Sequence, residues 1–82
     1  MNIKRNLAYL RCKYELTYAN IEELTGVNHS KIHRIENGIT KDPQISDITK
    51  LAKFFKVSLD DFVNENLRIK DNNLEEKSNR NN

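Results

Sequence analysis

The residues best suited to chemistry lie between positions 28 and 37, in the stretch NHSKIHRIEN. In a helix, Ile32 and Ile35 are three residues apart and share one apolar face. The opposite face carries the polar side chains Asn28, His29, Ser30, His33, Arg34 and Asn37. These groups can hydrogen-bond base edges or phosphates. The chemistry predicted for this face is therefore recognition of DNA in the major groove rather than catalysis.

A second predicted helix precedes this one and positions it. Thr17 is a residue type that caps a helix start, and the helix is predicted to run to about Thr25. Ile21 and Leu24 are expected to face inward on it. The two helices therefore form a pair joined by only a few residues, and the second helix of the pair carries the polar face.

The turn between these helices has strong sequence signals. Gly26 can adopt the positive φ that commonly ends a helix, and Val27 follows as an apolar plug. The side-chain oxygen of Asn28 can accept from the free N–H groups that begin the next helix. Asn37 and Gly38 form a second helix-ending signal after it. The pattern predicts helix, tight turn and helix over residues 17–38.

Three more helices are predicted around this pair. Residues 3–13 form one, with an apolar stripe of Ile3, Leu7, Leu10 and Tyr14. Residues 44–55 form another, with a buried face of Ile45, Ile48, Leu51, Ala52 and Phe55. A short fifth helix begins at Ser58, which resembles the first residue of a capping box. The predicted fold is all-α: one compact five-helix domain over residues 1–64.

The composition changes from residue 65 onward. Residues 65–82 are rich in asparagine, balanced in charge and poor in apolar side chains. Such a segment buries too little surface to offset the entropy of ordering, so it is predicted to be a flexible polar tail. The alternative is a short helix in which Leu67, Ile69 and Leu74 contact a protein partner.

Length and composition exclude several classes of protein. Eighty-two residues allow one domain with a small core, which dimerisation would help to stabilise. No apolar run approaches the ~20 residues that span a bilayer, and no signal-peptide hydrophobic region is visible, so a cytoplasmic location is expected. Cys12 is the only cysteine, which excludes an intrachain disulfide and a cysteine zinc cluster.

An enzyme and a metal site are both disfavoured. The sequence has no glycine-rich phosphate loop and no evident pair of nucleophile and base. His29 and His33 share a helix face, but no third ligand is evident nearby. No metal and no cofactor are expected. The net charge is only +2, yet residues 1–41 carry seven lysines and arginines against four acids, which suits a surface that faces DNA.

The motifs resemble a known family. The matching residues are Leu16-Thr17, Ile21, Thr25-Gly26-Val27, Ser30, Ile32, Arg34-Ile35-Glu36-Asn37-Gly38, Pro43, Leu51-Ala52-Lys53 and Val57-Ser58-Leu59-Asp60. Over roughly residues 3–64 the chain resembles the Cro/repressor-type (XRE-like) helix-turn-helix family of bacterial and phage DNA-binding proteins. Three positions depart from its pattern: Glu22 replaces a usual alanine, Tyr18 a usual glutamine and Lys56 a usual glycine.

The polar face and the resemblance together assign a DNA site. The residues expected at base edges are Asn28, His29, Ser30, His33 and Arg34. The residues expected at phosphates are Arg11, Thr17, Tyr18, Lys31, Asn37 and Lys41. The resemblance also implies an ion pair between Arg11 and Glu36.

The function expected is sequence-specific regulation of transcription, with repression of an inverted-repeat operator by a homodimer as the leading hypothesis. One alternative is an antitoxin that binds a toxin partner and its own promoter. Another is the controller of a restriction–modification system. A protein partner, either a toxin or an anti-repressor, is left open by the sequence.

Overall fold

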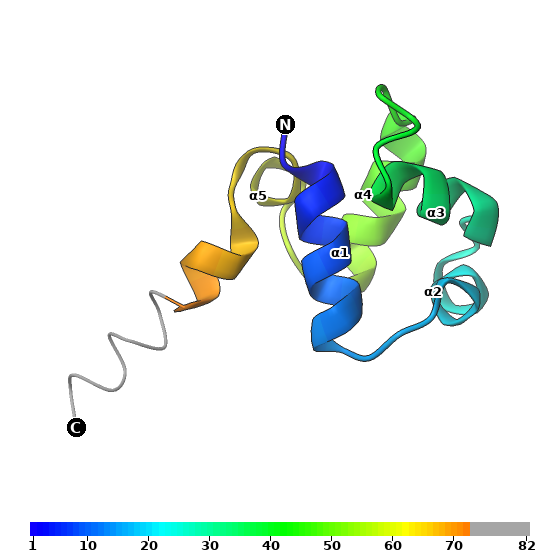
Figure 1. Cartoon of the computed structure of the whole chain (residues 1–82), viewed down its shortest axis with the longest axis horizontal. Helices are drawn as coiled ribbons and strands as arrows, with labels where there is room; N and C mark the ends of the chain where they lie inside the picture. The colour runs from blue at the N-terminus through cyan, green and yellow to red at the C-terminus, as the bar shows by residue number, and fades with distance from the viewer. Residues whose placement is uncertain (73–82) are drawn as a thin grey trace.

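Five helices and one further helical segment make up the described part of the chain, residues 1–72 of the computed structural model (Figure 1). The helices are α1 (Ile3–Lys13), α2 (Tyr18–Thr25), α3 (His29–Glu36), α4 (Ile45–Phe54) and α5 (Leu59–Asn64). Residues 67–72 are also helical, and residues 1–72 contain no strand. The predicted all-α fold is confirmed, with one helical segment more than predicted. No helix in this range is long and apolar enough to cross a membrane.

One apolar core joins the five helices. Leu7 from α1, Ile21 from α2, Ile32 from α3, Leu51 from α4 and Phe62 from α5 are all fully shielded from solvent. Each helix thus contributes at least one side chain from its predicted apolar stripe to the same cluster. The burial of these stripes fixes how α2 and α3 sit on the remainder of the domain.

Three residues predicted to be buried lie at the surface. Leu24 is 61% exposed, because it follows Ile21 by three residues and lies about 60° away around a helix that buries only Ile21. Ile45 is 64% exposed at the first position of α4. Tyr14 lies just beyond α1 and stacks on Phe55 with 6.1 Å between ring centroids. An apolar stripe weakens as a predictor near the ends of short helices.

Two helix ends use the left-handed conformation as predicted. Gly26 ends α2 with φ of 80°, and Gly38 follows α3 with φ of 73°. A side chain at either position would be strained. Lys56, at the usual glycine position after α4, also has a positive φ of 58°. A lysine in this conformation costs roughly 1 kcal/mol, which the rest of the fold offsets.

The segment that begins at residue 65 packs on the domain, which corrects the prediction of a flexible polar tail for residues 65–72. Leu67 is buried in the common core. Asn6 of α1 is fully buried and holds the segment: its Nδ2 donates to the carbonyl oxygens of Phe62 (2.7 Å) and Glu65 (2.8 Å). Its Oδ1 accepts from the Leu67 amide at 3.0 Å. Residues 73–82, with Leu74 among them, lie outside the described range.

Candidate nucleic-acid interface

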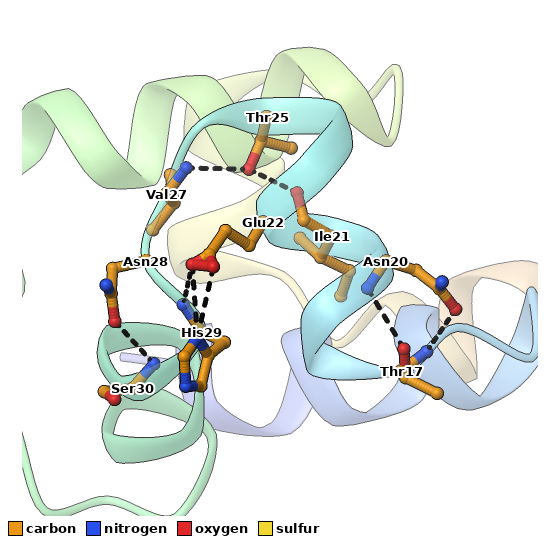
Figure 2. A network of polar contacts seen from close by, with 9 residues as sticks. All are labelled: Thr17, Asn20, Ile21, Glu22, Thr25, Val27, Asn28, His29 and Ser30. Atoms are coloured by element: carbon orange, nitrogen blue, oxygen red, sulfur yellow. Dashed lines mark hydrogen bonds and ion pairs between the residues drawn. The ribbon is translucent and has the colours of Figure 1, made fainter.

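A reciprocal pair of hydrogen bonds fixes the start of α2 (Figure 2). The Thr17 hydroxyl accepts from the Asn20 amide at 3.0 Å, and the Asn20 side-chain oxygen accepts from the Thr17 amide at 3.0 Å. This capping box confirms the predicted cap at Thr17. Asn20 was not predicted as its partner, because the usual residue at that position is Glu or Gln. The first turn of a helix leaves further N–H groups without partners inside the helix, and these can donate to a ligand.

The turn between α2 and α3 is held by its own side chains. The Thr25 hydroxyl donates to the Ile21 carbonyl at 2.7 Å and accepts from the Val27 amide at 3.1 Å (Figure 2). Val27 is buried as predicted. The Asn28 side-chain oxygen accepts from the Ser30 amide at 2.8 Å, which confirms the predicted cap of α3. These bonds make α2, the turn and α3 one preorganised unit.

The outward face of α3 brings together the five residues predicted for base edges. Asn28, His29, Ser30, His33 and Arg34 are all exposed on one side of the domain, whereas Ile32 and Ile35 on the other side are buried. Arg34 Nε donates to the Ser30 carbonyl one turn earlier at 3.1 Å. That bond directs the guanidinium group along the helix and leaves its terminal N–H groups for other acceptors.

Glu22 connects α2 to the first residue of α3. Its carboxylate accepts from the His29 amide at 3.1 Å, and each of its oxygens lies 3.1 Å from His29 Nδ1 (Figure 2). The hydrogen bond from the His29 ring, followed by that from the His29 backbone, lowers the pKa of Glu22. The carboxylate at this close crossing thus acts as a second cap for α3. This role was not predicted from the sequence, because Glu22 and His29 come into contact only across the turn.

Arg11, Tyr18 and Glu36 form a cluster beside the same face. Arg11 Nε lies 2.8 Å from Glu36 Oε1, which confirms the ion pair that the resemblance implied. The Tyr18 hydroxyl donates to the other Glu36 oxygen, and the Arg11 guanidinium lies 4.7 Å from the centroid of the Tyr18 ring. The hydrogen bond to Glu36 raises the pKa of both Arg11 and Tyr18. The Tyr18 proton is therefore engaged within the protein.

This cluster also touches the predicted reading face. The edge of the Tyr18 ring meets the His33 ring, with 5.4 Å between centroids and an interplanar angle of 88°. Arg11 Nη1 donates to the Leu16 carbonyl at 3.2 Å, just before the start of α2. The cluster ties α1, α2 and α3 together, and its Tyr18 ring packs against His33.

The fold and these contacts can be set against known protein families. A family model described as helix-turn-helix matches residues 7–62. The chain belongs to this helix-turn-helix family. It is of the Cro/repressor type, so it is a DNA-binding regulator of transcription. No curated protein and no solved structure gives a significant match.

In this helix-turn-helix protein, the residues predicted for phosphates border α3 on several sides. Thr17 lies at the start of α2, and Lys31, Asn37 and Lys41 are exposed on α3 or in the loop that follows it. Lys31 Nζ lies 3.5 Å from Asp47 Oδ2. The Asn37 side chain donates to the His33 carbonyl at 2.8 Å. Among residues 1–72, no three His, Cys, Asp or Glu side chains are grouped to hold a metal ion.

Proposed function

We propose that this helix-turn-helix protein is a repressor that binds an inverted-repeat operator as a homodimer. The observation that carries this proposal is the exposed polar face of α3, on which the five predicted base-edge residues gather opposite buried Ile32 and Ile35. A helix of this kind, held rigidly at its N-terminus, fits the major groove. The hydrogen bonds across the turn fix its orientation before DNA arrives, so little ordering is needed on binding.

Arg34 is the proposed reader of a guanine. Its guanidinium fork matches the O6 and N7 acceptors of that base. Asn28, His29, Ser30 and His33 supply shorter polar groups along the same face. Because the residues near the N-terminus of a recognition helix lie deepest in the groove, His29 and Ser30 are proposed to contact base edges and Arg34 to reach the next step of the duplex.

Phosphate contacts are proposed to set the position of α3 in the groove. The free N–H groups at the start of α2, beside Thr17 and Tyr18, suit a phosphate because the helix dipole adds positive potential there. Lys31, Asn37 and Lys41 are proposed to meet the backbone farther along. Arg11 adds positive charge at the edge of this surface while it remains paired with Glu36.

A homodimer is proposed because the domain is small and exposes apolar side chains near the proposed site. Ile39 is 62% exposed in the loop after α3, and Ile45 is exposed at the start of α4. In the family, this loop and the following helix often lie near a two-fold axis. A second copy placed there covers both isoleucines. Its α3 then enters the groove about one turn (~34 Å) away.

Selection of bound sequences from a random duplex pool, at about 150 mM salt, tests this function. We expect enrichment of an inverted repeat with half-sites about one turn apart. With roughly three to four phosphates neutralised per subunit, the log–log salt slope of the dimer should be about −5 to −7. Enrichment of a single half-site would exclude the dimer. The absence of any enriched sequence would exclude sequence-specific binding.

A further inference from the structure

The contact between Glu22 and His29 caps the start of α3 and also determines which nitrogen of the His29 ring carries a proton. A carboxylate can only accept hydrogen bonds, and both of its oxygens lie 3.1 Å from His29 Nδ1. The backbone N–H of His29 donates to the same group. His29 Nδ1 must therefore carry a proton for the contact to be favourable. In a neutral imidazole the other ring nitrogen, Nε2, is then an acceptor with no proton of its own.

The free nitrogen is directed away from this contact. Figure 2 shows Glu22 on the Nδ1 side of the ring and the other nitrogen on the opposite edge. The His29 side chain is 58% exposed, and His29 is the first residue of α3. Nε2 therefore lies at the N-terminal end of α3. In a recognition helix, this end is the part that makes base contacts.

We propose that Glu22 determines base preference at one operator position by fixing the tautomer of His29. With Nδ1 protonated, Nε2 accepts a hydrogen bond from an exocyclic amino group, which adenine and cytosine present in the major groove. Guanine O6 and thymine O4 are acceptors, and they would face the acceptor Nε2 without a proton between them. The expected preference is for an amino base over a keto base. This inference rests on the proposed function.

A purely structural role for Glu22 predicts a different outcome. If the carboxylate only caps α3, its replacement changes the stability of the helix start but not the identity of the preferred base. Glu22→Gln separates these roles. The amide keeps the size of the side chain and one acceptor oxygen, yet it can also donate to Nδ1. Both tautomers of His29 then become available.

The first arm of the test measures the tautomer without DNA. Long-range 1H–15N NMR of the imidazole, at about pH 8 where a histidine is ordinarily neutral, distinguishes protonated from unprotonated ring nitrogens. Wild-type His29 should show a protonated Nδ1 and an unprotonated Nε2. Glu22→Gln should shift both nitrogens toward intermediate values. Glu23→Gln, the same charge change at the neighbouring exposed position, should leave the wild-type pattern. A protonated Nε2 in the wild type would overturn the proposal.

The second arm measures base preference by selection from a random duplex pool at the same pH. Wild type and Glu23→Gln should prefer adenine or cytosine at one position of each half-site, by roughly five-fold, the factor that one hydrogen bond supplies. Glu22→Gln and His29→Ala should lose that preference and keep the others. An amino-base preference that survives Glu22→Gln overturns this inference alone. A wild-type protein that enriches no sequence overturns both the inference and the proposed function.

Discussion

The two ends of this domain use polar side chains in opposite ways. At the helix-turn-helix end, the capping contacts join residues two to seven positions apart in the sequence, and most are exposed. The other end is formed by α5 and the segment after it, which lie on the opposite side of α1 from α2 and α3 (Figure 1). There, buried Asn6 of α1 bonds to residues 56, 59 and 61 positions away in the sequence. The first arrangement presents donors and acceptors to a ligand. The second satisfies buried groups and holds the chain together.

This difference separates binding from stability. An exposed side chain that caps no helix can be removed with little effect on folding. Removing a buried side chain that satisfies three backbone groups leaves those groups without partners. Substitutions of the exposed side chains His33 and Arg34 on α3 should therefore change DNA binding at constant stability, and substitutions at Asn6 should change stability first.

The largest effect is expected from Asn6→Ala. It leaves the buried Phe62 carbonyl and Leu67 amide without their partner, so the free energy of unfolding should fall by about 2 to 4 kcal/mol. Urea unfolding measures this loss. Asn64→Ala, which removes an exposed hydrogen bond to Asp60, is the control and should cost under ~0.5 kcal/mol. Equal losses in the two variants would remove the contrast between the ends of the domain.

Arg34→Ala should have the next largest effect, on binding alone. Loss of a guanidinium that contacts guanine should weaken specific binding by roughly 1 to 3 kcal/mol and relax one base position. Titration of a fluorescent operator measures the change, and the urea midpoint should stay the same. Arg68→Ala, an exposed arginine at the opposite end, is the matched control. If Arg34→Ala keeps both affinity and base preference, Arg34 is not the reading residue.

Tyr18→Phe tests the cluster that links α1 to the recognition end. The change removes the hydrogen bond to buried Glu36 and keeps the ring beside His33. We expect a loss of about 1 kcal/mol in the free energy of unfolding, because Glu36 retains Arg11 as a partner. Tyr14→Phe, at an exposed tyrosine, should change stability little. A larger effect of Tyr14→Phe than of Tyr18→Phe would contradict the structural importance of the cluster.

The smallest effect on stability is expected from a substitution of Asp71, which lies in the helical segment of residues 67–72. The Tyr9 hydroxyl, at 2.6 Å, and then Lys13, at 3.1 Å, lower the pKa of Asp71. A group whose pKa is lower in the folded state adds stability above its unfolded pKa and loses it as the pH falls through the folded pKa. Asp71→Asn should therefore cost up to ~1 kcal/mol at neutral pH. Unfolding curves should show this gap closing below about pH 4. A gap that widens in acid would contradict this sign.

The structure of the helix-turn-helix end could be predicted from the sequence because the residues that determine it act locally. Thr17, Gly26 and Asn28 act on backbone groups a few residues away, so their types and spacing were sufficient. The pairing of Arg11 with Glu36 followed from the resemblance to the family. Such determinants predict where α2 and α3 start and end, and which face of α3 is exposed.

The other end could not be predicted in the same way. Asn6 is one of several polar residues on an amphipathic helix. No neighbouring residue in the sequence indicates that its hydrogen-bond partners lie about 60 positions later. Leu67 lies in a polar context, so its burial was not expected. The role of Glu22 was missed for a related reason, since its contact with His29 requires the turn geometry. Long-range and cross-turn contacts depend on the assembled fold.

The most direct test is a 1H–15N NMR titration of the protein with its selected operator duplex, at about 150 mM salt. If α3 reads DNA, the amides of residues 28–34 and of Thr17 and Tyr18 should show the largest chemical-shift changes, and those of residues 65–72 should change little. Changes concentrated on residues 65–72, with α3 unaffected, would contradict the assignment of α3 as the helix that binds DNA.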